Sequence, residues 1–203
     1  MTQNKTWLVG LTGGIACGKS HVSQTLAALG AAVVDADGIS RALTAPGGDA
    51  LPAVRQAFGD AVFSGEELNR ALLARAVFGK KAEIARLNAI LHPMVFAEME
   101  RRIEQAAGQP AVVLDVPLLY ETGFDRRCAE VWCVWAPRHL QEQRLLARGM
   151  TLNEARLRVE SQMPPDEKAR RADRVILTIG DKRDSAKAAE ALWDGLMRRI
   201  ALG

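Results

Sequence analysis

The sequence has little of what marks several large classes of protein. Aromatic residues make up only 5% of the 203-residue chain, and no row of them offers a surface on which bases would stack. The net charge of +3 is too small to indicate a nucleic-acid partner by itself. No apolar run approaches the roughly 18 residues of a transmembrane helix. We therefore expect neither a nucleic acid nor a membrane among its partners.

Cysteine is also scarce, and its pattern excludes two common uses. The chain has three cysteines, and Cys128 and Cys133 do not form a C-x-x-C pair. The count is odd, so we expect no disulfide framework and no zinc site. We interpret both residues as small apolar side chains buried beside a strand. The first residues lack the apolar segment of a secretory signal, so we expect a cytoplasmic protein, either a monomer or a small homo-oligomer.

A glycine-rich stretch near the N-terminus is the strongest positive signal. It fits the phosphate-binding pattern G-x-x-x-x-G-K-[ST], with Gly13, Gly18, Lys19 and Ser20 at the defined positions. Backbone N–H groups of such a loop converge on an anion, and the following helix adds its partial positive charge. Lys19 is expected to reach the terminal phosphates, and Ser20 to ligate Mg²⁺. We assign nucleotide binding to Gly13, Gly14, Ile15, Ala16, Cys17, Gly18, Lys19, Ser20 and His21.

The segments around this stretch have the order that a phosphate loop needs. Residues 7–11 form a short apolar run that predicts a buried strand. Apolar residues at helical spacing follow over 19–29, and Gly30 predicts the end of that helix. A second apolar run, 31–34, predicts another strand.

Two acidic residues, Asp35 and Asp37, follow the second predicted strand. Ligands of open α/β sheets bind at the carboxyl ends of the strands, so we expect at least one of the two to be catalytic. The alternative is that one of them only caps a helix beginning near Gly38.

Residues 38–107 predict helices and contain no strong strand signal. We expect helices over 51–58, 69–78, 82–91 and 94–107. His92-Pro93 is expected to end the third, because the residue before a proline disfavours the α region. Such a block between two strands looks like an insertion, which in a phosphotransferase would supply the acceptor pocket.

Several residues of this block are candidate ligand contacts. His92 either holds the acceptor or a phosphate, or bonds the last carbonyls of a helix. The arginines are either anion contacts or solvated side chains on exposed helix faces. They are Arg41, Arg55, Arg70 and Arg75.

The apolar run 111–115 predicts a third strand that ends on Asp115. This resembles the Walker B pattern, whose aspartate supports Mg²⁺. The stretch that follows, 116–121, holds Pro117 and Leu118 and predicts either a loop wall against a ligand or an apolar plug over the core.

The rest of the chain predicts strands over 131–135 and 174–180, and helices over 137–147, 152–162 and 185–201. Arg144 and Arg148 share one helix face. The basic hairpin that they belong to fits a mobile lid that closes on phosphates. The alternative is a pair of exposed helices whose arginines bind Glu142, Glu154 and Glu160.

Alternating strands and helices predict an α/β fold with a parallel sheet flanked by helices. One candidate function is that of a small P-loop kinase that acts on a nucleoside monophosphate or a metabolite. A GTPase-type switch is a weaker alternative, since no N-K-x-D occurs in the sequence. An inactive nucleotide-binding module fits poorly with Lys19, Ser20 and the acid pair together.

Six stretches along nearly the whole chain carry a family resemblance. They are 11–20, 34–37, 91–93, 116–121, 162–164 and 172–176. In this order they resemble the dephospho-CoA kinase family. The Leu-His-Pro and Val-Pro-Leu-Leu pieces are more specific than the phosphate loop, which many families share.

The resemblance implies one P-loop kinase domain, 1–203, that uses ATP and Mg²⁺ to phosphorylate the ribose 3′-hydroxyl of dephospho-CoA. It implies a core of 1–37, 108–136 and 172–203, a helical CoA-binding insertion of about 38–107 and a lid of about 137–171. Asp37 would be the base that accepts the hydroxyl proton, and Asp35 its structural or metal-linked neighbour. The residues assigned to the acceptor are Asp35, Asp37, Arg41, His92, Pro117 and Leu118.

The chain departs from the family pattern at three places. His21 stands where the family usually has threonine, Ala16-Cys17 where it usually has a small pair such as Gly-Ser, and Thr178 where it usually has asparagine. Cys17 admits two interpretations. Either helix N-terminal N–H groups lower the pKa of its thiol, so that alkylation there blocks ATP, or it is a small residue tolerated in the loop.

Overall fold

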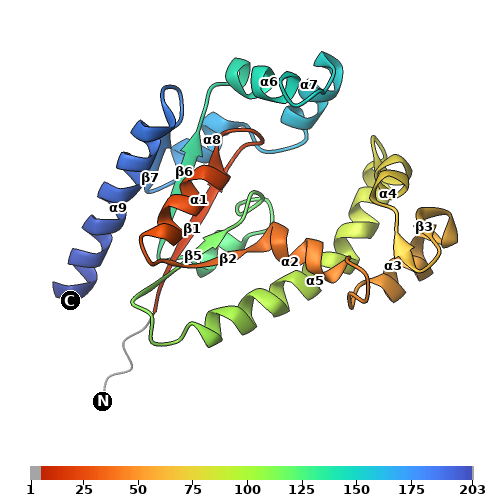
Figure 1. Cartoon of the computed structure of the whole chain (residues 1–203), viewed down its shortest axis with the longest axis horizontal. Helices are drawn as coiled ribbons and strands as arrows, with labels where there is room; N and C mark the ends of the chain where they lie inside the picture. Colours follow the sequence, from red (N-terminus) through yellow and green to blue (C-terminus); the bar gives the residue numbers. More distant parts are fainter. Residues whose placement is uncertain (1–5, 203) are drawn as a thin grey trace. The chain divides into compact units, whose positions relative to one another are not determined.

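The structure, a computed structural model, describes residues 6–202. They divide into two compact units (Figure 1). The first runs to Val34 and resumes at Ala106, and the second is Asp35–Gln105. Within residues 6–202, no helix has both the length and the apolar character needed to cross a membrane.

A five-stranded sheet, in the order β2-β5-β1-β6-β7, is the base of the first unit. Its strands are β1 (Trp7–Gly13), β2 (Ala32–Asp35), β5 (Ala111–Asp115), β6 (Glu130–Trp135) and β7 (Arg174–Leu177). β1 pairs in parallel with β5 and β6, and β6 with β7. Every residue of β5 is buried, as a continuous apolar run predicts for a strand covered on both faces. The predicted parallel sheet is confirmed.

Helices cover this sheet (Figure 1). They are α1 (Lys19–Ala28), α8 (Pro165–Arg171) and α9 (Lys182–Leu202). Helices α6 (Arg138–Leu146) and α7 (Leu152–Glu160) form a hairpin beyond the strand ends, and η2 (Phe124–Arg127) is a short 3₁₀ helix. Leu26 of α1 and Leu196 of α9 are fully buried in one cluster with Leu11 and Trp132 of the sheet. The phosphate-loop helix α1 is therefore held against the sheet by apolar burial.

One helix of this unit was not predicted. Pro164-Pro165 looked like the end of a helix, but Pro165 is the first residue of α8. Proline is tolerated there, because the first N–H groups of a helix have no intrahelical acceptor. β7 also ends at Leu177, earlier than the predicted strand over 174–180.

The second unit is mostly helical, with α2 (Ala36–Leu43), α3 (Leu51–Phe58), α4 (Arg70–Val77), α5 (Lys81–Gln105) and the 3₁₀ helix η1 (Asp60–Val62). The expectation of no strand was wrong in one place. β3 (Phe63–Ser64) and β4 (Glu67–Leu68) form an antiparallel hairpin. Two-residue strands are too short to show an alternating pattern, while Gly65, at φ 64°, suits the turn between them.

The expected break at His92-Pro93 was also wrong. α5 is one 25-residue helix with Pro93 inside it. A proline in a helix interior costs about 3 kcal/mol. Burial offsets this cost, because Leu87, Leu91 and Met94 pack on the unit's own core, and Val95 and Met99 are buried.

Candidate active site

The glycines of the phosphate loop are required by its geometry. A Cβ atom at Gly13 would lie 2.5 Å from Val134 O and 2.6 Å from Cys17 Sγ, closer than packed atoms approach. Gly18 has a φ of 96°, in the left-handed region that favours glycine. The loop backbone therefore passes close to β6 before it turns into α1.

The first turn of α1 is suited to an anion. Its N-cap is Gly18, which makes no side-chain cap, and the turn contains no acidic residue. The free N–H groups and the helix dipole both favour negative charge at this end. Ser20 lies exposed in the same turn.

Lys19, the first residue of α1, forms an ion pair with Asp115. Asp115 is the last residue of β5, and the sheet register places it beside Leu11, close to the start of the loop. Only 11% of the Lys19 side chain and 7% of the Asp115 side chain are exposed. The structure thus brings the lysine of one motif and the acid of another to the same edge of the sheet.

The α6–α7 hairpin contacts the phosphate loop directly. Leu145, Ala155 and Val159 form a small buried cluster, on which Ile15 and Ala16 of the loop pack. From α6, Arg144 Nη1 donates to Ala16 O at 3.1 Å, and the same guanidinium donates to Thr178 O. Arg144 therefore joins the predicted lid to the loop through backbone carbonyls.

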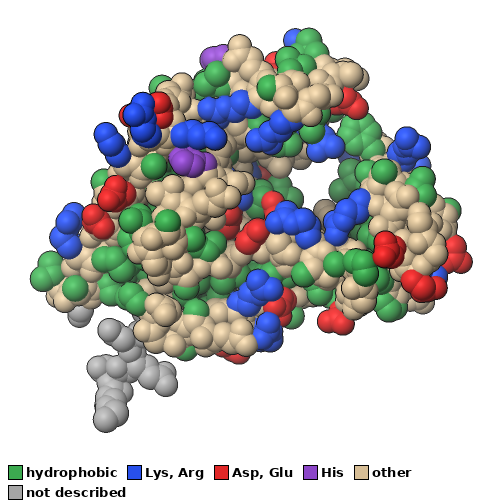
Figure 2. Space-filling view, in the orientation of Figure 1, with side chains coloured by type: hydrophobic (Ala, Val, Ile, Leu, Met, Phe, Trp, Pro, Cys, Tyr) green, Lys and Arg blue, Asp and Glu red, His purple; other side chains and the backbone are tan. Residues whose placement is uncertain are grey.

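Arg148 and Arg138, two other basic residues of the hairpin, are more exposed to solvent than Arg144. Arg148 is exposed. Arg138 donates to Glu142 at 2.8 Å and to Glu160 at 2.6 Å, as the alternative of paired surface charges predicts. Lys and Arg side chains gather beside α6 on the face shown in Figure 2.

The three departures from the family pattern lie around one turn. Thr178 Oγ1 donates to Cys17 O, and its methyl group would be 3.3 Å from a Cβ at Gly18. His21 Nε2 lies 3.0 Å from Lys182 O, in the segment that follows Thr178. The sequence comparison noted these positions separately, and only the structure shows that they are neighbours.

Two glutamines beside the loop were missed by sequence reasoning. Gln162 Oε1 accepts a hydrogen bond from Ile15 N at 2.9 Å. Gln141 is buried, donates to Ala136 O at 2.8 Å and would be 3.0 Å from a Cβ at Gly14. The Gln-Met-Pro stretch was a signal for Gln162, but nothing in the sequence indicated its partner.

Pro117 and Leu118 of the predicted acceptor wall are partly buried. Pro117 O accepts from Thr12 Oγ1 at 3.1 Å and from Lys168 Nζ at 2.5 Å. Leu119 is fully buried, so this stretch is partly the apolar plug of the alternative.

The remaining acceptor-side residues belong to the second unit. Asp37 is exposed in the first turn of α2. Asp35 stands at the N-cap of this helix without capping it through its side chain, and instead binds Arg41 at 3.1 Å. The capping alternative is therefore wrong for Asp35.

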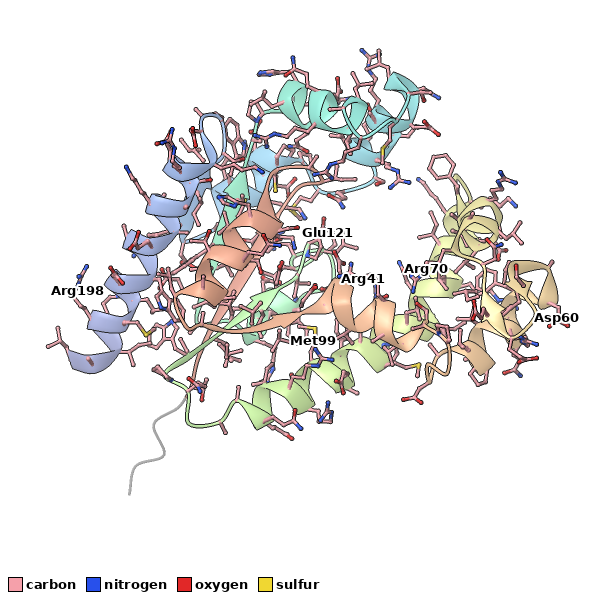
Figure 3. The ribbon with its side chains drawn as sticks, in the orientation of Figure 1. Arg41, Asp60, Arg70, Met99, Glu121 and Arg198 are labelled. Atoms are coloured by element: carbon pink, nitrogen blue, oxygen red, sulfur yellow. The ribbon has the colours of Figure 1, made fainter. Side chains whose placement is uncertain are left out.

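His92 lies inside α5, so it does not end a helix as the second interpretation required. Its ring centroid is 5.6 Å from that of Phe96, and partial burial lowers the pKa of its imidazole. Arg70, the first residue of α4, donates to Thr44 Oγ1 at 2.9 Å and to Arg41 O at 3.1 Å (Figure 3).

The hypothesis of a reactive Cys17 is contradicted. Only 1% of the residue is exposed, and burial raises the pKa of its thiol. We expect a thiol reagent to label Cys17 in the folded protein as slowly without ATP as with it, because reactivity requires both access and thiolate. Peptide mass mapping after timed alkylation measures this. Rapid labelling of Cys17 that saturating ATP suppresses would contradict the expectation, with Cys128 as the internal reference.

Known proteins resemble this chain over most of its length. A family model described as dephospho-CoA kinase matches residues 7–184. A dephospho-CoA kinase of Symbiobacterium thermophilum is 47% identical over 190 residues, which cover 92% of this chain and 80% of the relative. One of Geobacillus kaustophilus is 40% identical and covers 94% of this chain and 98% of the relative.

Solved structures agree on the fold. A crystal structure of a Thermus thermophilus protein has a TM-score of 0.80 at 32% identity, covering 94% of this chain and 98% of that one. The Campylobacter jejuni dephospho-CoA kinase, at 21% identity and a TM-score of 0.64, shares the fold over 93% of this chain and 96% of its own. By sequence and by fold, this chain belongs to the dephospho-CoA kinase family, and it is a phosphotransferase.

Proposed function

We propose that this protein transfers the terminal phosphoryl group of ATP to the ribose 3′-hydroxyl of dephospho-CoA, the final step of coenzyme A biosynthesis. One observation supports the phosphoryl-transfer chemistry most directly. Lys19, at the uncapped start of α1, meets the buried Asp115 at the carboxyl end of β5. A cation, free N–H donors and a carboxylate are thereby gathered where a triphosphate would bind.

In this proposal, residues 13–20 bind the phosphates of ATP. The loop's backbone N–H groups and the Lys19 ammonium stabilise the negative charge of the transferring group. The transition state of phosphoryl transfer is loose, so positioning and charge stabilisation contribute most of the catalysis. Arg144, bound to Ala16 O, holds the α6–α7 lid on the loop, and Arg148 is the more exposed candidate for phosphate contact.

The donor set suits Mg²⁺. Asp115 offers a carboxylate and Ser20 a hydroxyl, both hard oxygen donors. Mg²⁺ is usually held by one or two carboxylates together with substrate phosphates, so these two side chains fit it without a full protein cage. When bound, the ion would neutralise charge on the phosphates.

Asp37 is the proposed base for the acceptor hydroxyl, with Asp35 as its neighbour. Asp35 is the last residue of β2, and Asp37 lies two residues later, exposed at the start of α2. Arg41 forms an ion pair with Asp35 at 3.1 Å. We propose the second unit, Asp35–Gln105, as the acceptor-binding insertion and the α6–α7 hairpin as the lid.

An acceptor panel tests the proposed function. ADP release is measured with dephospho-CoA, with nucleoside monophosphates and with shikimate, and the product is identified by mass spectrometry. We expect turnover with dephospho-CoA only, and a product heavier by one phosphoryl group. Faster turnover with a nucleoside monophosphate would show that the protein is a kinase but that dephospho-CoA is not its acceptor.

A further inference from the structure

Lys168 of α8 is a buried cation outside the phosphate-binding residues. None of its side chain is exposed (0%), although lysine is almost never fully buried unless it is paired. Its ammonium donates to Pro117 O at 2.5 Å and lies 2.9 Å from Glu121 Oε1. Two acceptors therefore offset the desolvation of this charge.

Glu121, labelled in Figure 3, also accepts a hydrogen bond from a second donor. Met163 N donates to its Oε1 at 3.0 Å, so one carboxylate binds both α8 and the segment that leads into it. A quarter of its side chain (25%) is exposed. The first and last residues of the loop 117–121 are thus held by donors from elsewhere in the chain.

Gln162 extends this network to the phosphate loop. It accepts from Ile15 N through its side chain, while its neighbour Met163 donates to Glu121 through the backbone. These two residues lie just after α7, whose last residue is Glu160. One short segment therefore binds the phosphate loop on one side and the loop 117–121 on the other.

We propose that Lys168 and Glu121 are positioning residues that hold the loop 117–121 at a defined distance from the phosphate loop, so that acceptor and phosphoryl donor align. The inference rests on the proposed function, since it takes Pro117 and Leu118 as acceptor contacts. Lys168 and Glu121 act through Pro117 O and Met163 N, and no proton or phosphoryl group passes through them. Two motifs far apart in the sequence, V-P-L-L-Y-E and Q-M-P, meet at Glu121 for this purpose.

Lys168→Met tests the proposal, because it keeps the buried stem and removes the ammonium. Displacing a substrate by about 1 Å costs about 100-fold in rate. We therefore expect kcat/KM for dephospho-CoA to fall by about 10- to 100-fold, through a higher KM for the acceptor and a lower kcat. The Kd of ATP, measured by calorimetry, should stay near its wild-type value.

Glu121→Gln is the second variant, and it serves if Lys168→Met does not fold. Its amide oxygen still accepts from Met163 N, but the charge that binds Lys168 is lost. The same rise in acceptor KM is expected. Because both residues act as one unit, the double variant should lose no more than the worse single variant.

Arg199→Gln is the matched control. Arg199 Nη2 lies 2.5 Å from Glu130 Oε2, and only 9% of the Glu130 side chain is exposed. This change removes one partner from a largely buried carboxylate of the same unit, so it should lower the Tm and leave KM and kcat unchanged. Equal kinetics in Arg199→Gln and Lys168→Met at equal Tm loss would reduce Lys168 to a structural role and overturn the proposal.

Hydrogen exchange separates this proposal from the proposed function. Lys168→Met should speed amide exchange over 116–123 and over 13–20, whereas Arg199→Gln should not. Unchanged exchange in both segments overturns the positioning role, whatever the acceptor is. Faster exchange in a protein whose wild type ignores dephospho-CoA would support the positioning role and reject the proposed acceptor.

Discussion

Replacing Lys19 with methionine is expected to lower kcat/KM by about a thousandfold. Removing one donor that stabilises transition-state charge typically costs about 100- to 1,000-fold, and cationic groups at transferring phosphates reach higher values. Lys19 stands at the N-terminus of α1, which has no side-chain cap and whose dipole favours an anion. Initial rates of ADP release, measured with ATP varied at saturating dephospho-CoA, give this kcat/KM.

The same change is expected to lower stability. Asp115, whose side chain is 7% exposed, would lose its ion-pair partner. Removing one partner of a buried pair costs about 3–5 kcal/mol. In urea unfolding, Lys19→Met/Asp115→Asn should therefore be more stable than Lys19→Met alone, while remaining inactive. A folded Lys19→Met variant with turnover within tenfold of wild type would contradict the role given to Lys19.

Asp37→Asn is expected to lower kcat by about 100-fold or more, the usual contribution of a general base. The amide keeps the size and hydrogen-bonding atoms of the carboxylate and removes its basicity. The Kd of ATP should change little, since Asp37 is assigned to the acceptor side. Single-turnover rates and calorimetry with ATP separate the two effects.

Asp49→Asn is the control for this change, because it removes one negative charge from another exposed position of the same unit. It should leave kcat and both KM values unchanged. Near-normal turnover in Asp37→Asn would remove Asp37 from the base role, and Asp35→Asn would then be the next variant to measure.

Two prolines account for misplaced boundaries of the predicted helices. Pro93 signals a helix end locally, yet apolar burial by Leu91 and Met94 keeps α5 continuous. Pro165 signals a stop as well, yet it begins α8. For Pro93, tertiary contacts outweigh a local preference of a few kcal/mol, whereas Pro165 occupies the first turn of a helix, where proline is tolerated.

The phosphate loop shows the opposite case, in which short-range sequence is sufficient. Gly13 and Gly18 are required by the path of the backbone, and Lys19 follows them at the first position of the helix. A pattern of this kind depends on residues within a few positions of one another. It therefore predicts the loop, the strand before it and the helix after it correctly.

The sequence by itself determined the strand–loop–helix unit, the alternation that builds the parallel sheet and the family to which the chain is similar, because these follow from local spacing and motif order. Only the tertiary structure decided which residues meet. It paired Lys19 with Asp115, Arg144 with Ala16, and Lys168 with Glu121. Their partners lie 47 to 128 residues away along the chain, and only the packing of helices on the sheet brings such groups within hydrogen-bond distance.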